Sequence, residues 1–356
     1  MKQISTLTEF LESGGLKLDF YDMGRRVTRI TREAFVNFEL TETPFPAPLQ
    51  QQAWFALILS DPENTDIEPM IWFVRFPLDE QAKLVQAARD DFLHRLMENL
   101  GQGAIGKHDE MQAAIQDNPY LFQPKEERLA VFHARFTAKL GKPASRYYEH
   151  ARAYFNGDLG WEQWSFIGYQ GIADLAARLD HDSNQAQVNK AIAELPAAPL
   201  EAFCHCLENE SIAKPLALSL GKRAQEALKQ PEPDLKVITA VIRGTSQSKA
   251  ENHRNELILK ILNHPISCRS EVLVAVSGRA WECLSDQQIS RLFLDRLASN
   301  EVGQDFFNGI LSDLLYMPKT RHYLQSLMRD PQRSDQLSQS IGNFFDSLSP
   351  EVIKSD

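Results

Sequence analysis

The sequence predicts an α+β N-terminal module followed by a mostly α-helical remainder that ends in α-solenoid-like (HEAT-like) helical hairpin repeats. Three observations predict this architecture. Two runs with strand periodicity flank an acidic loop before residue 77, apolar residues recur at helical spacing beyond Pro119, and helical hairpins recur every 34 to 36 residues beyond Pro199. We therefore expect an α+β module over 1–106, an aromatic-rich helical block over 107–198 and hairpin repeats over 199–356.

The N-terminal module begins with a predicted short helix, because Thr6 and Glu9 form a capping box that precedes apolar residues. The run "LKLDFYD" at 16–22 alternates apolar and polar residues, which predicts a strand. Residues 23–40 fit either strands or a helix, and we favour strand pairs because β-branched residues are frequent there. The segment "PFPAP" predicts an irregular connector, and the aromatic and β-branched runs at 51–61 and 68–76 predict a hairpin.

A predicted helix over 80–100, capped by Asp79, is followed by a glycine pattern that resembles nucleotide-binding motifs. Gly101, Gly103 and Gly106 match G-x-G-x-x-G, and Lys107 completes most of a P-loop. Phosphate-binding glycines must follow a strand and begin a helix, where the helix dipole is positive. These glycines follow the end of a helix, so we interpret them as a C-terminal cap and a joint.

The middle of the chain predicts three helices that are rich in aromatic residues. The first follows Pro124 and presents Phe132, His133 and Phe136 on one stripe, and the second runs from Pro143 to Asn156. The third continues from Trp161 to about Leu179. Its two glycines, at 168 and 171, predict the close approach of another helix, because a mid-helix glycine costs about 1 kcal/mol that packing must offset.

In the last part of the chain, apolar clusters repeat when successive hairpins are aligned at Pro199, Pro233, Arg269 and Gly303. One hairpin alone cannot bury these faces, so stacking against neighbouring hairpins is expected. The agreement between repeats is poor residue by residue, and an irregular helical bundle with the same period stays a possible alternative.

Composition excludes several classes of protein. The 356 residues carry a formal net charge of −10, which argues against a nucleic-acid-binding protein. The chain has no long apolar run and no secretory leader pattern, and its four cysteines are too few for a disulfide framework, so we expect a cytoplasmic protein without membrane contact. Cys204 and Cys206 diverge around a helix and cannot grip one zinc ion, so we expect no metal and no cofactor.

One group of side chains in the aromatic block is a candidate site for a ligand or partner, although a core with an ordinary surface ion pair between Asp174 and Arg178 also explains it. The candidate residues are His133, Tyr148, Trp161, Trp164, Tyr169, Gln170, Asp174 and Arg178. In an enzyme, His133 would act as acid and base and Arg178 would bind an anion.

Five strings, all before residue 180, are similar to a proteobacterial family known only as a domain of unknown function. They are "YDMGRRV", "PFPAPLQQQAW", "MIWFVRFPLDEQ", "NPYLFQP" and "WSFIGYQGIADLAARL". The resemblance implies a bacterial, cytosolic protein and supplies no activity.

Our interpretation is therefore a cytosolic scaffold or adaptor whose helical repeats receive a protein partner. No nucleophile, metal cluster or phosphate cradle in the sequence competes with this reading. The alternatives are an enzyme or small-ligand-binding regulator with a pocket near His133, Asp174 and Arg178, and an RNA-associated factor, which would need a local basic groove.

Overall fold

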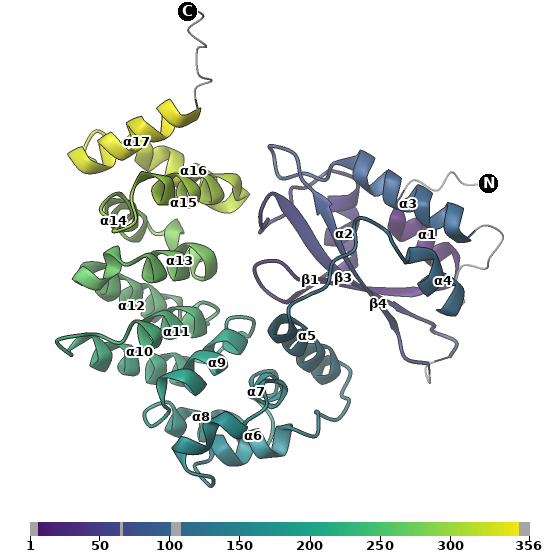
Figure 1. Cartoon of the computed structure of the whole chain (residues 1–356), viewed down its shortest axis with the longest axis horizontal. Helices are drawn as coiled ribbons and strands as arrows, with labels where there is room; N and C mark the ends of the chain where they lie inside the picture. The colour runs from purple at the N-terminus through teal and green to yellow at the C-terminus, as the bar shows by residue number, and fades with distance from the viewer. Residues whose placement is uncertain (1–5, 65–66, 101–107, 349–356) are drawn as a thin grey trace, which may run out of the picture. The chain divides into compact units, whose positions relative to one another are not determined.

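The computed structural model describes residues 6–64, 67–100 and 108–348, which form two compact units. The first unit comprises residues 1–128 with Tyr316–Lys319, and the second comprises 129–315 with 320–356. Most of the described chain is helical, and one four-stranded antiparallel sheet lies in the first unit (Figure 1). The division into three segments at residues 106 and 198 rests on sequence periodicity and stays a prediction.

The sheet of the first unit has the strand order β2-β1-β3-β4, and all neighbouring strands are antiparallel. Its register places Phe20 opposite Leu57 and Phe55 opposite Val74. The predicted strand at 16–22 and the predicted hairpin are both confirmed. The strands are β1 (Lys17–Asp22), β2 (Thr28–Ile30), β3 (Gln52–Ser60) and β4 (Met70–Pro77).

The helices of this unit supply one side of its core. Phe20 of β1 stacks on Phe35 of α2 with ring centroids 4.0 Å apart, and Phe55 of β3 meets Phe35 edge to face at 5.2 Å. Alternate residues of the central strands enter the same cluster as the apolar faces of the helices, as period-two burial requires. The helices are α1 (Leu7–Ser13), α2 (Arg32–Glu39), α3 (Gln86–Leu100) and α4 (His108–Ile115).

Two elements of this unit differ from those predicted. Residues 32–39 form a helix rather than a strand, because the Thr31 hydroxyl caps the Ala34 amide and Phe35 packs on the sheet. Helix α3 begins at Gln86, six residues later than predicted. Asp79 instead accepts backbone hydrogen bonds from Gln81 (2.9 Å) and Lys83 (2.8 Å) in a turn before the helix.

The predicted capping box of α1 is confirmed, since the Thr6 hydroxyl accepts a 3.0 Å hydrogen bond from the Glu9 amide. Helix α3 is described as far as Leu100, and its predicted end at Gly101 falls beyond the described residues. The glycines themselves lie at 101–107, outside the described residues. Beyond them, α4 begins at His108.

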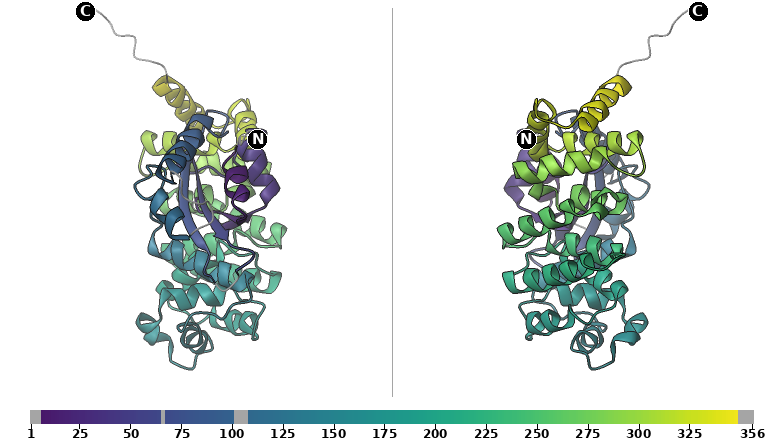
Figure 2. Two further views of the ribbon diagram at one scale, coloured as in Figure 1. Left: turned by 90° about the vertical axis from the view of Figure 1, so that its right-hand side faces the viewer. Right: turned by 90° about the vertical axis from the view of Figure 1, so that its left-hand side faces the viewer.

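The second unit is all helical in its described part. In Figure 2 its helices follow one another in layers from teal to yellow. The α-helices are α5 (Glu126–Lys139, which begins in the first unit), α6 (Tyr148–Phe155), α7 (Tyr169–Ala176), α8 (Asn184–Ala191), α9 (Ala197–Leu207), α10 (Lys214–Leu228), α11 (Leu235–Thr245), α12 (Glu251–Asn263), α13 (Ser270–Arg279), α14 (Gln287–Ala298), α15 (Gln304–Tyr316), α16 (Pro318–Met328) and α17 (Asp335–Leu348). Short 3-10 helices are η1 (Trp161–Phe166), η2 (Pro265–Cys268) and η3 (Trp281–Ser285).

The single helix predicted from Trp161 to about Leu179 is wrong, because the segment divides into η1 and α7 at Gly168. The predicted close approach is confirmed at Gly171. A Cβ atom there would collide with the carbonyl oxygen of Tyr147, at the start of α6. The preceding predicted helix is also shorter than expected, since α6 begins at Tyr148 rather than at Pro143.

The predicted starts of the helical hairpins agree with the observed helices to within two residues. Helices α9, α11, α13 and α15 begin at Ala197, Leu235, Ser270 and Gln304. Their apolar faces are buried, as Phe203, Ile238 and Val276 illustrate. The period read from the sequence therefore locates real helices.

Candidate functional site

The eight candidate residues all lie in the second unit, on α5, α6, η1 and α7 or directly after α7. The structure brings four of them together, His133, Tyr148, Asp174 and Arg178, and places the other four elsewhere. The two groups have different environments, so each is described separately.

Asp174 and Arg178 form a buried ion pair. The guanidinium Nη1 of Arg178 donates a 2.8 Å hydrogen bond to Asp174 Oδ1. The Asp174 side chain is 1% exposed and the Arg178 side chain is 5% exposed. The other carboxylate oxygen of Asp174 accepts a hydrogen bond from the Ser145 amide at 3.0 Å. Arg178 Nη2 also donates to the Thr137 hydroxyl at 3.1 Å. The predicted pairing is present, but the predicted surface position is wrong, because α5 and the segment before α6 cover the pair.

Tyr148 connects this pair to the start of α8. Its ring lies 5.9 Å from the guanidinium carbon of Arg178, and its hydroxyl accepts a 2.7 Å hydrogen bond from the Asn184 side chain. Asn184 is fully buried and also donates to the backbone oxygen of Arg178. Arg152 Nε donates a 3.0 Å hydrogen bond to the side-chain oxygen of Asn184. The sequence analysis did not identify Asn184, although it is the residue that joins α6, α8 and the end of α7.

His133 lies beside this network on α5. Burial lowers the pKa of its imidazole, and the negative charge of Asp174 partly opposes that shift. An imidazole whose pKa is lowered from 6.5 is neutral at pH 7. The charge of Asp174 therefore acts on His133, and both are residues that the enzyme interpretation places at its pocket.

The charged and polar groups of this network nevertheless point at one another. Each oxygen of the Asp174 carboxylate has a partner within the unit, and the Asn184 side chain makes three hydrogen bonds within the same unit. A buried polar network whose members satisfy each other stabilises a fold, and a binding site leaves groups for its ligand. The geometry favours a structural role for Asp174 and Arg178.

Tyr169 and Gln170 of α7 face other elements. The Tyr169 hydroxyl lies near the Cys206 thiol of α9, and burial raises the pKa of this tyrosine above its usual range. Gln170 donates a 3.2 Å hydrogen bond to the backbone oxygen of Ala130 on α5. Both residues join α7 to its neighbours.

Trp161 and Trp164 lie on η1, which contributes no buried residue. Trp161 is half-buried and packs edge to face on Tyr154, with ring centroids 5.6 Å apart. Trp164 is 43% exposed, and Phe166 on the same 3-10 helix is 73% exposed. Tyr147 at the start of α6 is 42% exposed. Among the candidate residues, Trp164 is thus the one that solvent reaches most freely.

A column of charged residues that the sequence analysis did not single out crosses three hairpins. Glu208, directly after α9, is 2% exposed. Its Oε2 accepts a 2.6 Å hydrogen bond from Arg243 Nε of α11, and the Nε of Arg279 of α13 lies 3.2 Å from the same oxygen. The sequence contains a signal for this column, because Arg243 and Arg279 follow Glu208 at nearly the predicted period of 34 to 36 residues.

The first unit contains a buried carboxylate within the "YDMGRRV" string. Asp22 is 6% exposed, and its Oδ1 accepts a 2.7 Å hydrogen bond from the Gly24 amide. Burial raises its pKa to about 7, while the Gly24 amide and three arginines, Arg128, Arg25 and Arg26, act in the opposite direction. Asp22 is thus a buried carboxylate whose surroundings in the first unit favour its neutral, protonated form.

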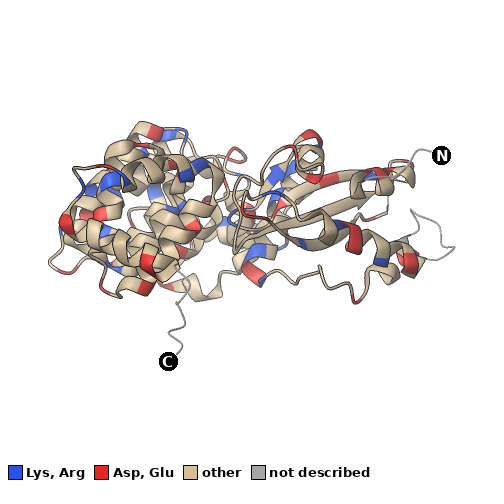
Figure 3. Ribbon diagram, turned by 90° about the horizontal axis from the view of Figure 1, so that it is seen from above, with Lys and Arg blue, Asp and Glu red and all other residues tan. Residues whose placement is uncertain are grey.

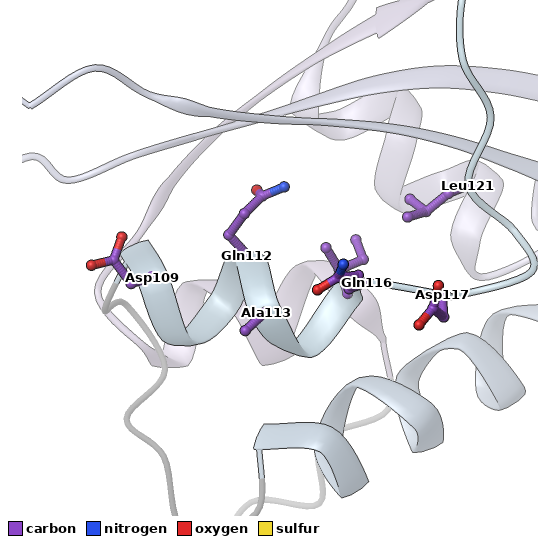
Figure 4. Close-up of a pocket in the computed structure, with 7 residues that line it drawn as sticks. Asp109, Gln112, Ala113, Gln116, Asp117 and Leu121 are labelled. Carbon is purple, nitrogen blue, oxygen red and sulfur yellow. The ribbon is translucent and has the colours of Figure 1, made fainter.

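A shallow hollow along α4 is lined by carboxylate and amide side chains, including Asp109, Gln112, Gln116 and Asp117. Figure 4 shows these side chains spread along the helix and the turn that follows it, without convergence on one point. The arrangement does not resemble a catalytic constellation.

The described residues contain no group of three or more His, Cys, Asp or Glu side chains that could hold a metal ion. Cys204, Cys206 and Cys283 are buried, and burial raises the pKa of each thiol. Within the same described ranges, no helix is both long and apolar enough to cross a membrane.

Searches of curated proteins and of solved structures returned no match. The model of one protein family, described as "Protein of unknown function (DUF3549)", matches residues 2–345. This match confirms the resemblance seen in the sequence strings. Because it covers nearly the whole chain, the protein belongs to this family of unknown function.

Proposed function

We propose that this protein is a cytoplasmic scaffold or adaptor whose second unit is an α-solenoid-like stack of helical hairpins that binds a protein partner. A solenoid exposes an extended, curved surface, because each hairpin contacts only its neighbours. Such surfaces commonly bind other proteins. The four cysteines, all free, fit a reducing compartment.

The observation that carries the proposal is the column formed by Glu208, Arg243 and Arg279. Residues at equivalent positions of three successive hairpins meet at one carboxylate oxygen. Such a meeting supports an arrangement in which the hairpins lie in register, one above the next.

The contacts between helices support the same arrangement. The first helices of successive hairpins contact each other, α9 with α11 and α11 with α13, and so do the second helices, α10 with α12 and α12 with α14. Gly244 of α11 approaches α9 so closely that a Cβ atom there would lie 2.7 Å from Cys204 Sγ. These neighbour-to-neighbour contacts are typical of repeat proteins.

The charge pattern favours a protein partner over nucleic acid. Lys and Arg residues alternate with Asp and Glu residues over the helices of the second unit (Figure 3), and the net charge of the chain is −10. Binding to nucleic acid needs a surplus of cations to replace counterions at the phosphates. A surface that carries both positive and negative charges is suited to binding a protein partner.

Affinity capture of the full-length protein from a lysate of its source organism tests this function. The proposal predicts one protein recovered at near-equal molar amount, by contacts that survive nuclease treatment. Capture that disappears with nuclease would indicate nucleic acid. Recovery of no protein above the level of an unrelated helical bait would contradict the proposal.

A further inference from the structure

The side of the second unit formed by η1 and the start of α6 exposes aromatic side chains. Their exposure does not stabilise the folded monomer. We call Tyr147, Trp164 and Phe166 the aromatic corner. Phe166 is 73% exposed, Trp164 is 43% exposed and Tyr147 is 42% exposed. Burial of such side chains is favourable, so their exposure favours a role in binding.

The corner is held in place by buried neighbours. The Tyr154 hydroxyl donates a 2.9 Å hydrogen bond to the backbone oxygen of Trp161, whose ring also packs on Tyr154. At the other end of η1, a Cβ atom at Gly168 would lie 3.5 Å from the ring of Tyr147. The backbone that carries Trp164 and Phe166 is therefore held near both of its ends, which reduces the entropy cost of binding.

An exposed cation lies at the same corner. The guanidinium carbon of Arg146 is 4.9 Å from the centre of the Tyr147 ring, and its Nη2 lies 2.7 Å from the Tyr147 hydroxyl oxygen. Among the described residues, no carboxylate lies within ion-pair distance of Arg146. The nearby carboxylate of Glu149 is already paired with Arg152 at 3.0 Å.

Glu162, the acidic residue of η1, faces the opposite end of that short helix. A Cβ atom at Gly160 would lie 2.6 Å from its Oε1, and its charge acts on Tyr154. The charge closest to Tyr147 is therefore positive. A stacked arginine beside exposed aromatic rings is the composition of an interface hot spot, and it complements a carboxylate next to an apolar side chain.

We propose that the aromatic corner binds an acidic segment of the protein partner, with an apolar side chain of that segment on Phe166 and Trp164 and a carboxylate on Arg146. This inference rests on the proposed function, because it identifies where and how the partner binds. It excludes a basic or purely polar segment at this surface.

Selection of short random peptides on the immobilised full-length protein, with counter-selection on Phe166→Ser, tests the proposal. We expect the enriched peptides to combine a Phe, Trp, Leu or Ile with nearby Asp or Glu. Binding of a selected peptide should weaken by about tenfold or more in Arg146→Glu, as expected for a hot spot. The matched control is Val302→Ser, because Val302 is also apolar and is 60% exposed elsewhere in the unit.

Three results would overturn the proposal: no enrichment over the Phe166→Ser variant, enrichment of basic peptides, or equal binding by Arg146→Glu. Because the substituted side chains are exposed, an unchanged thermal unfolding curve should accompany each variant. Lysate capture then separates the two proposals. A partner retained by the double variant of Phe166→Ser and Arg146→Glu would contradict the aromatic corner alone, whereas failure of every bait to capture a protein would contradict the proposed function.

Discussion

Asp22 is a carboxylate in an environment that opposes its charge, in spite of the arginines around it. Burial raises its pKa from 3.8 to about 7, so the folded protein retains a proton that the unfolded chain has released. A group of this kind lowers the free energy of unfolding as the pH rises from about 4 to about 7. The carboxylate nevertheless accepts a hydrogen bond from the Gly24 amide. The side-chain oxygen of an asparagine would accept the same hydrogen bond.

We predict that Asp22→Asn reduces the loss of stability between acidic and neutral pH. Relative to the native chain, the variant should gain on the order of 3 kcal/mol of unfolding free energy from about pH 4.5 to about pH 7.5, since one pKa unit is worth 1.36 kcal/mol. Urea unfolding of both full-length proteins at the two pH values measures this gain. Parallel pH profiles would show that the Asp22 carboxylate has an ordinary pKa.

At the residue scale, the sequence predicted the identity of several interacting side chains better than their burial. The spacing of Asp174 and Arg178 predicted their ion pair, but only the packing of α5 and α6 shows that it is buried. Asn184 was not predicted, because its hydrogen bonds join segments far apart in the chain. Similarly, Gln50 and Gln51 adopt positive φ angles of 55° and 58° in a two-residue turn that their residue types do not signal.

At the scale of elements, Gly171 determines how closely α7 approaches the start of α6. A methyl group at this position would meet the backbone oxygen of Tyr147, which cannot move without displacing α6. We expect Gly171→Ala to destabilise the protein by about 1–3 kcal/mol. The control is Gly309→Ala on α15, where the added Cβ meets nothing within 4 Å.

This control should be stabilising by about 0.5–1 kcal/mol, because alanine has the higher helix propensity. Thermal unfolding of the two variants beside the native protein gives both values. Equal effects of the two substitutions would mean that α6 and α7 do not pack as described.

The stacking of hairpins is tested by a double-mutant cycle on Glu208 and Arg243. Glu208 is almost fully buried and loses the nearer of its two arginine partners when Arg243 is removed, so the coupling energy should be about 1–3 kcal/mol. The comparison cycle uses Arg269 and Glu301, a 2.9 Å pair whose side chains are 49% and 40% exposed. Its coupling should stay below about 1 kcal/mol. A Glu208–Arg243 coupling no larger than that of the exposed pair would contradict the registered stack.

Elements with strong local signals were predicted correctly, and those decided by tertiary packing were not. The capping box of α1, the hairpin of β3 and β4, and the starts of α9, α11, α13 and α15 follow from local sequence. Residues 32–39 form a helix because Phe35 stacks on Phe20, and this long-range contact outweighs the β-branched residues. The break before α7 was also missed, since tryptophan and glycine at helical spacing fit both a continuous and a broken helix.

At the scale of the whole molecule, the sequence indicated an α+β part before a helical part, and the structure has a sheet-containing unit and a helical unit. The period of 34 to 36 residues predicted the hairpins of the second unit but not the contacts between equivalent positions. Those contacts depend on rotation between hairpins, which no single hairpin encodes. Function is harder to predict than fold, because a binding surface on such a protein would be formed by several hairpins together.

Hydrogen–deuterium exchange of the full-length protein with and without its captured partner tests the central claim, that the second unit is the binding surface, most directly. We predict slower exchange within residues 129–348, at several successive hairpins and at η1, with little change in β1 to β4. Protection confined to the first unit, or no protection in any hairpin, would contradict it.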